Sequence, residues 1–594
     1  MKRFKILILA IATVGLFGCE NYLSQEPQDA FPDSPAFWSN ETVLELETNY
    51  FYSAFQSYGT AHNGQYYSES ISDDYCGGYS EFPATVPASN GVWTSSYQEI
   101  RRANIILNRM KDMSLTDEAR AHWEGFARFY RGLQHFDLVR EFGDCVWVDT
   151  ETDIDDSLTL SNPRNDRADV MKNACADMQY AGENCREGGQ NTFGKYVAWA
   201  LLSRAALYEA AWQKYHENNT TNAIYFYEIA KNAAYQIISS GKYSVHEDYA
   251  SNYISPDLTG NSEMILFKQF IRNSNITIAH GLHGYSTSST AIWGLTKSAV
   301  ESFVNSDGLP IYQSPLGYSD ETVDEVMANR DARLGHIAND SVLMLSNYSW
   351  LNGMNATTGY WTTKFVSWDY LWGSANNLAP YNDTDGPVYA YGEVLENYAE
   401  ACAELASLGA YTITQNDLNI SVNELREKHG KVPALTLQGQ DGVSVNGTVI
   451  QADPKNTFGV STLLWELRRD RRSELMCDGQ RYNDLMRWKM GSCLDFDENA
   501  DGFVGASKDA VLAYINATYN DDIHDAESAE ASINAVNEGQ FWYDIEGKTY
   551  VSAFNVKNKS NWRKFDENKN YLSPIPSSES LLNPNLLPNN PGWE

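Results

Sequence analysis

The sequence lacks any patterned set of cysteines. Its eight cysteines include no CxxC pair, which argues against a disulfide framework or a zinc site of the usual spacing. We interpret most of them as small buried apolar residues, with Cys175 and Cys185 as a candidate disulfide. HExxH, GxSxG and GxxxxGK[ST] patterns are also missing, so zinc-protease, hydrolase-elbow and P-loop chemistry have no support.

Positive charge is also scarce. Lys and Arg number 44 against 78 Asp and Glu, a net charge of -34, which repels phosphate backbones and makes nucleic acid an unexpected partner. No long Pro/Gly/Ser tract or low-complexity segment divides the 594 residues. We therefore expect one large irregular domain with insertions instead of several small domains joined by linkers.

The N-terminus carries an export signal. Basic residues at positions 2, 3 and 5 precede an apolar run from Ile6 to Leu16, which ends in Phe17-Gly18-Cys19. The run is shorter than the roughly 20 apolar residues that span a bilayer, so it resembles a bacterial lipoprotein signal peptide over 1–18. Cleavage would leave Cys19 as a lipidated first residue that anchors the chain to a membrane. The alternative is an ordinary secreted protein in which Cys19 has no special role.

Helical periodicity dominates the first half of the sequence. From Thr116, a typical N-cap residue, apolar residues recur at steps of three and four, and Gly143 provides a stop. A second apolar stripe over 197–212 is followed by Ala230, Ala234 and Ile237, and small residues facing large ones are typical of tetratricopeptide-type helix pairs. Further helices are predicted at about 94–112, 391–408, 417–429 and 461–490.

Between about 251 and 390, and again from 494 to 570, short apolar runs alternate with Gly, Asn, Ser and Pro. This pattern predicts loops and short strands, where binding residues commonly lie. The predicted fold is therefore mostly α, with tetratricopeptide-like helical pairs as a scaffold and long irregular loops. We expect a single domain over 19–594, with its helical frame at about 40–250 and 390–490.

Several segments share a pattern with a known family. They are NYL at 21–23, FYRGLQHFDLVREFGD at 129–144, ALLSRAALY at 200–208, GEVL at 392–395 with YAEA at 398–401, RRSELMCDGQRYNDLMRW at 471–488, YLSPIP at 571–576 and NPNLLPNNPGW at 583–593. In this order they resemble the SusD/RagB family of outer-membrane nutrient-binding lipoproteins, and the resemblance runs nearly end to end.

The resemblance implies a non-enzymatic, SusD-like protein that is lipid-anchored in the outer membrane and faces the cell exterior. It would capture an oligosaccharide or polysaccharide and pass it to a SusC-like TonB-dependent outer-membrane transporter. One alternative is a transporter lid or structural surface lipoprotein with no glycan affinity, or one that binds peptide. Another is a surface glycoside hydrolase, which needs two carboxylates about 5–9.5 Å apart; with 78 acidic residues, such pairs carry no weight.

The aromatic content agrees with saccharide binding. Sixteen Trp, 37 Tyr and 23 Phe exceed what the core needs, and sugar rings pack on aromatic planes beside polar groups. The alternative for each ring is burial under a loop, and Trp368 and Trp372 could instead share one face of a strand. The candidate glycan-binding residues are Asp73, Asp74, Tyr75, Tyr79 and Trp93, then Tyr285 and Trp293, and then Trp368 and Trp372 in a cluster with Trp361 and Tyr370.

Two acidic patterns remain. Asp497, Asn499 and Asp501 precede Gly502 as in the start of a calcium loop, but the twelfth position is Lys508 instead of Glu. Structural calcium is thus a possible cofactor, with a polar turn as the alternative, and no other cofactor is expected. A second pattern places acidic residues at 466, 470, 474 and 478, where Arg469, Arg471 and Arg481 could neutralise them in an ion-pair lattice.

Overall fold

The computed structural model describes residues 37–55, 58, 68–76, 82–152, 156, 159–273, 275–282, 294–342, 358–368, 381–518, 542–552 and 555–593. Helices dominate this part of the chain, and the strands are short, which confirms the predicted fold class. Among the described residues, no helix combines the length and apolarity needed to cross a bilayer. The expected lipid-bearing Cys19 lies outside the described residues.

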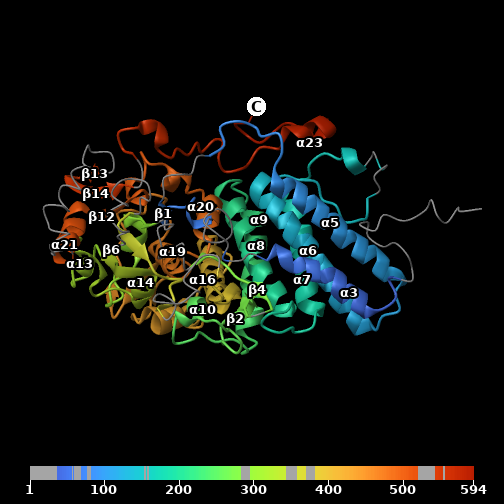
Figure 1. Cartoon of the computed structure of the whole chain (residues 1–594), viewed down its shortest axis with the longest axis horizontal. Coiled ribbons are helices and arrows are strands. Elements are labelled where there is room, and N and C mark those ends of the chain that lie inside the picture. The colour runs from blue at the N-terminus through green and yellow to red at the C-terminus, as the bar shows by residue number, and fades with distance from the viewer. Residues whose placement is uncertain are drawn as a thin grey trace, which may run out of the picture.

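The first half is a row of helices that pack in chain order (Figure 1). From α5 to α9, each helix contacts the one that follows it. Helix α9 then contacts α16, from the second half of the chain. This arrangement confirms the predicted consecutive helix pairs. The helices are α3 (Glu41–Thr48), α5 (Gly91–Arg109), α6 (Asp117–Phe142), α7 (Arg167–Asn184), α8 (Lys195–Tyr215), α9 (Thr220–Ile238) and α16 (Tyr391–Ser407).

The ends of α6 follow from two residues. The Thr116 side chain accepts a hydrogen bond from the Ala119 backbone N–H at 3.1 Å, which satisfies one donor of the first turn. Gly143 ends the helix with φ at 72°, a conformation that favours glycine. Both ends were predicted from the sequence.

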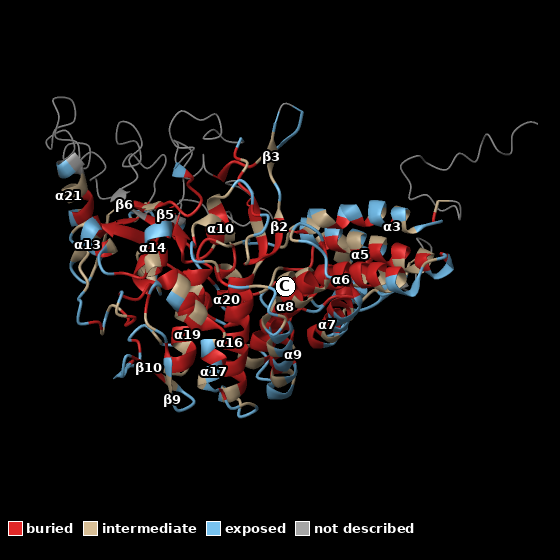
Figure 2. Ribbon diagram, turned by 90° about the horizontal axis from the view of Figure 1, so that it is seen from below, coloured by how far each residue is buried: buried red, intermediate tan, exposed pale blue. Residues whose placement is uncertain are grey.

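The predicted helix at 461–490 is interrupted. It forms α19 (Thr462–Glu474) and α20 (Arg481–Arg487), because Cys477 and Gly479 adopt positive φ angles of 73° and 75° between them. The predicted helix at 417–429 is similarly divided into α17 (Gln415–Asn419), α18 (Val422–Leu425) and a π-helical turn (Arg426–Gly430). Buried residues gather in α8, α16, α19 and α20 at the centre of the molecule (Figure 2).

Short antiparallel sheets lie mainly in 251–390 and 494–570, where short strands were predicted, and one further sheet lies at 436–449, within the region predicted as helical frame. The pairs are β1 (Tyr75–Cys76) with β5 (Gly294–Leu295), β2 (Met264–Lys268) with β8 (Gly386–Ala390), β3 (Ile271–Arg272) with β4 (Thr277–Ile278), and β6 (Ala338–Val342) with β7 (Tyr360–Thr362). Two three-stranded sheets join β9 (Thr436–Gln438), β10 (Gly442–Val445) and β11 (Thr448–Val449), and β12 (Val504–Ser507), β13 (Trp542–Ile545) and β14 (Lys548–Ser552).

Shorter helices connect these sheets to the frame. They are α10 (Ser251–Ile254), α12 (Lys297–Ser302), α13 (Val323–Met327), α14 (Ala332–Ile337), α21 (Lys508–Thr518) and α23 (Ser577–Leu582), with 3₁₀ turns η1 (Asn49–Ala54), η2 (Met110–Asp112), η3 (Thr159–Ser161), η7 (Gly491–Leu494), η8 (Ala500–Gly502), η9 (Lys559–Asn561) and η10 (Pro584–Leu586).

All seven described cysteines are free thiols and six of them are buried, which confirms their interpretation as small core residues. The candidate Cys175–Cys185 disulfide is wrong, since both thiols are free and the Cys185 thiol donates to the His122 carbonyl at 3.3 Å.

Candidate functional site

The structure brings Tyr75, in the first predicted stretch, beside the residues that directly follow the second predicted stretch. In the antiparallel pair of β1 and β5, Tyr75 faces Leu295 and Cys76 faces Gly294. Cys76, the last residue of β1, therefore lies beside Gly294, the first residue of β5. The segments that continue from these two residues lie outside the described part of the chain. Tyr79, Tyr285 and Trp293 belong to those segments, so their assignment as ligand contacts stays a prediction.

The third predicted aromatic cluster is close to the same pair. The Thr358 hydroxyl, just before β7, donates a hydrogen bond to the Leu295 carbonyl of β5. The Trp361 and Trp368 rings meet edge to face, with centroids 5.8 Å apart and an interplanar angle of 81°. Trp368 is 49% exposed and Trp361 is half-buried, so this pair presents an aromatic surface to solvent.

The strand alternative for this cluster does not hold for Trp368. β7 ends at Thr362, so Trp368 lies beyond the strand. Trp372 and Tyr370 lie outside the described residues. Trp361 and Trp368 are thus the members of this cluster that lie within the described residues.

Tyr75 and Trp93 do not present rings to solvent. Tyr75 is 0% exposed and belongs to an apolar cluster with Leu295, and Trp93 is 4% exposed and packs edge to face on Phe142 with centroids 5.1 Å apart. A saccharide stacks on an open ring face, and neither residue has one here. We therefore do not retain Tyr75 and Trp93 as stacking residues.

Asp73 and Asp74 are also turned inward. The Asp73 carboxylate accepts hydrogen bonds from Nε and Nη2 of Arg481 at 2.7 and 3.0 Å, and Asp74 accepts one from Nε of Arg472 at 2.7 Å. Burial raises the pKa of Asp73, but the charges of Arg472 and Arg481 outweigh it and hold the pKa at about 2. These carboxylates hold the segment that directly precedes β1 against α19 and α20. We therefore assign them a structural role instead of ligand contact.

The predicted calcium ligands do not converge. Asp501 pairs with Lys455 at 2.7 Å and Lys297 at 3.2 Å, Asp497 pairs with Lys564, and the Asn499 amide donates to the Cys493 carbonyl at 2.9 Å. Within the described ranges, no three His, Cys, Asp or Glu side chains gather as a metal site would require. The residues present therefore do not fit a calcium ion, and the polar turn is the better interpretation.

The exposed aromatic residue Tyr381 was not predicted from the sequence. Tyr381 is 41% exposed, and the guanidinium carbon of Arg272, on β3, lies 4.8 Å from its ring centroid. In Figure 2, β3, β5 and β6 lie toward the same edge of the molecule. No periodicity or motif marks Tyr381, because its neighbours are irregular loop residues and its partner lies more than a hundred positions away.

Solved structures share the overall fold of this chain. A SusD-like carbohydrate-binding protein from Bacteroides fragilis is 20% identical over 93% of this chain and 100% of its own, with a TM-score of 0.65. Another SusD-like protein from the same species is 18% identical over 94% and 98%, with a TM-score of 0.62. B. fragilis NanU is 16% identical over 96% and 100%, with a TM-score of 0.55. At these identities the likeness shows the fold.

Family models identify the chain itself. The SusD family model matches residues 269–593, more than half of the chain, and a second model, described as starch-binding and associating with the outer membrane, matches residues 51–239. The chain belongs to the SusD family. SusD-like protein P2 from Formosa agariphila is 35% identical over 74 residues, which span 12% of this chain and only 15% of that protein.

Proposed function

We propose that this protein is a lipid-anchored surface protein that captures oligosaccharides outside the outer membrane without cleaving them. It then passes them to a SusC-like TonB-dependent transporter. The observation that carries the proposal is the exposed Trp361–Trp368 pair beside the β1–β5 strands. The family model described as starch-binding and associating with the outer membrane supports both the ligand class and the location.

The chemistry of the pair suits reversible capture. The C–H face of a sugar ring packs on an aromatic plane, and such aromatic contacts are worth about 0.5–1.5 kcal/mol each. Two or three rings therefore give modest affinity, which allows a bound saccharide to be released to a second protein. Binding that is too tight would oppose transfer, because affinity differences between related complexes lie mainly in the dissociation rate.

Affinity gel electrophoresis with a panel of soluble polysaccharides tests the capture step. We expect the purified mature protein to be retarded by at least one glycan and Trp368→Ala to be retarded less. Tyr225→Ala is the matched control, since Tyr225 on α9 is similarly exposed at 43% and lies outside the proposed site. Equal retardation of wild type and Trp368→Ala would contradict the proposed site. Retardation of the wild-type protein by immobilised peptide alone would favour peptide capture.

Product analysis tests the absence of catalysis. After prolonged incubation with the glycan that binds, we expect no new reducing ends or shorter oligosaccharides. Release of such products would show a glycoside hydrolase instead. Co-purification of a TonB-dependent barrel with the tagged, membrane-anchored protein tests the transfer partner, and its absence after crosslinking would contradict the handover.

A further inference from the structure

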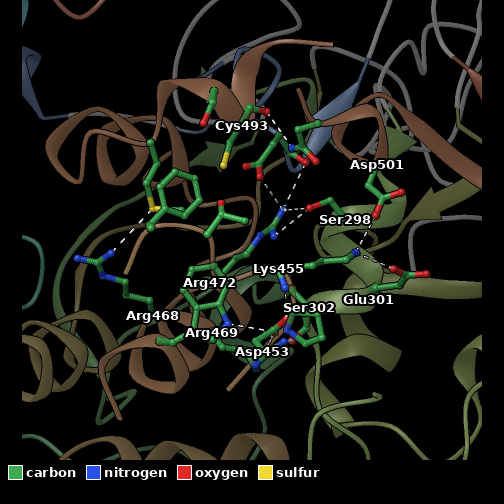
Figure 3. Close-up of a pocket in the computed structure, with 18 of the residues that line it drawn as sticks. Ser298, Glu301, Ser302, Asp453, Lys455, Arg468, Arg469, Arg472, Cys493 and Asp501 are labelled. Carbon is green, nitrogen blue, oxygen red and sulfur yellow. Dashed lines mark hydrogen bonds and ion pairs between the residues drawn. The ribbon is translucent and has the colours of Figure 1, made fainter. Parts of the chain in front are cut away.

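The structure also contains a cleft of about 720 Å³ that is lined by neither Trp361 nor Trp368. It is bounded by α19, α12, the loop 453–458 and the turn η8 (Figure 3). Its volume falls in the range of about 300–1,000 Å³ that is typical of small-molecule sites. The buried pair of Asp73 with Arg472 and Arg481 forms part of its wall.

One wall of the cleft is aromatic. Phe458 and Trp465 stack with ring centroids 6.5 Å apart at 17°, and Tyr312, which is 39% exposed, joins them in the lining. Two of these rings are fixed at their polar ends: the Trp465 indole N–H donates to Asp453 at 3.0 Å, and the Tyr312 hydroxyl donates to the Gln451 carbonyl at 2.9 Å. Ring planes held in this way form a preorganised apolar surface.

The charges that line the cleft balance. Five cations (Lys455, Arg468, Arg469, Arg472 and Arg481) face five carboxylates (Asp73, Glu301, Asp453, Glu498 and Asp501). Lys455 spans the cleft from the loop to Asp501 at 2.7 Å and Glu301 at 3.1 Å, and Arg469 pairs with Asp453 (Figure 3). The cleft is therefore strongly polar but has no excess of either sign.

This balance selects the ligand class. An anionic ligand would have to take a paired cation from its carboxylate partner, and a cationic ligand would have to do the same to reach any lining carboxylate except the exposed Glu498; a buried charge left unpaired is costly. A neutral polyhydroxylated ligand needs no such exchange, because each hydroxyl can donate to a carboxylate and accept from a guanidinium or ammonium group. The aromatic wall then offers the stacking plane that a pyranose ring uses.

We propose that this cleft is a second saccharide site, which binds an uncharged oligosaccharide independently of the Trp361–Trp368 surface. The ligand class assigned to the cleft rests on the proposed function. The experiments below can contradict either of the two sites without contradicting the other. Two separate sites on one anchored protein would hold a long polysaccharide at two points, and this raises the apparent affinity without new contacts.

The test uses isothermal titration of the full mature protein with maltohexaose, cellohexaose, xylohexaose and mannohexaose. We expect Tyr312→Ala to weaken binding of at least one hexaose by about three- to tenfold, the effect of losing one ring contact. Tyr312→Phe, which retains the ring but loses the hydrogen bond to Gln451, should weaken binding less than Tyr312→Ala. The same loss should appear when Tyr312→Ala is made in the Trp368→Ala background.

A second variant tests the cleft independently, in case Tyr312→Ala does not fold. Thr457 is an exposed lining residue, so Thr457→Trp should fill the cleft without disturbing the core, and Thr457→Ser is its control. We expect Thr457→Trp to abolish the binding that remains in Trp368→Ala. Hexagalacturonate and hexalysine serve as charged probes and should not bind at this site.

The outcomes separate the two proposals. Hexaose binding that Trp368→Ala removes completely, or that neither Tyr312→Ala nor Thr457→Trp changes, overturns the cleft site and leaves the first site standing. Binding that depends on Tyr312 and not on Trp368 overturns the first site and supports the cleft. A wild-type protein that binds no hexaose, or whose cleft variants affect only a charged probe, overturns the inference.

Discussion

At the scale of single residues, charged side chains find partners far along the chain. Of the acidic row on α19, Glu466 pairs with Arg469 at 3.0 Å as predicted from the sequence. Asp470 instead contacts Arg333 and Arg426 at 3.1 and 2.7 Å. The lattice was therefore predicted correctly in kind, but most of its partners were not, because sequence spacing shows only neighbours on the same helix.

The Asp73–Arg481 pair gives the first prediction. Asp73→Asn keeps the shape of the side chain but leaves the buried Arg481 guanidinium without its charge partner, while Arg472 keeps its pair with Asp74, so we expect a loss of about 3–5 kcal/mol in the free energy of unfolding. Urea denaturation measures it. Asp497→Asn is the control, since the carboxylate of Asp497 is half-exposed and its pair with Lys564 should contribute little. Equal stability of the two variants would contradict the structural role of Asp73.

His429 gives a prediction of pH dependence. Its ring nitrogens lie 2.8 Å from Glu474 and 2.9 Å from Glu263. Burial lowers the pKa of His429, but these carboxylates outweigh it and raise the pKa to about 10. A folded-state pKa above the unfolded value of about 6.5 stabilises the protein fully below pH 6.5, and this contribution is lost as pH rises toward 10.

The measurement compares wild type with His429→Gln by urea denaturation across pH. The difference in the free energy of unfolding should be largest near about pH 6 and should shrink steadily toward about pH 10. A difference that stays constant over this range would show that His429 is not held in its charged form by the two glutamates.

At the scale of elements, the sequence predicted helices well where their ends carry chemical signals. Thr116 and Gly143 bound α6 because a hydroxyl satisfies the first turn and glycine tolerates the left-handed exit. The break between α19 and α20 was missed, because one of its two positive-φ residues is Cys477, a residue type that gives no signal for that conformation. The pairing of β1 with β5 could not be predicted either, because two-residue strands have no periodicity.

Helix packing gives a prediction at this scale. A Cβ added at Gly182 of α7 would lie 2.5 Å from the Trp199 ring of α8, and a packed indole cannot move aside easily. We expect Gly182→Ala to destabilise the protein by about 1–3 kcal/mol. Gly335→Ala in α14 is the control, because nothing lies within 4 Å and alanine there should be neutral or stabilising. Thermal melts distinguish them, and a tolerated Gly182→Ala would mean that α7 and α8 can separate slightly.

At the scale of the whole molecule, the chain combines a charge-paired helical frame with exposed aromatic residues at the ends of short strands. The sequence predicted the family and the mostly helical fold. It did not predict which rings are accessible, because Tyr75 and Trp368 are equivalent in type and differ only in burial, at 0% and 49%. Burial depends on contacts between distant segments, which a single sequence does not show.

Membrane attachment is the prediction for the whole protein. Cells that express the full chain and are labelled with palmitate should yield a labelled band in the outer-membrane fraction. Cys19→Ala should remove the label and release the protein from that fraction, because the acyl chains supply the membrane affinity. An unlabelled wild type that still sediments with membranes would indicate attachment through a partner instead of a lipid.

The ion pairs around α19 also constrain how this protein can evolve. Asp470 contacts both Arg333 and Arg426, so a mutation of Asp470 removes an ion-pair partner from two buried guanidinium groups at once, and tolerated change there favours compensating mutations. Trp368 at the surface carries no comparable penalty, and a single mutation there can be neutral for folding. Descendants of one ancestral gene can therefore vary their exposed loop residues while inheriting the same helical frame almost unaltered.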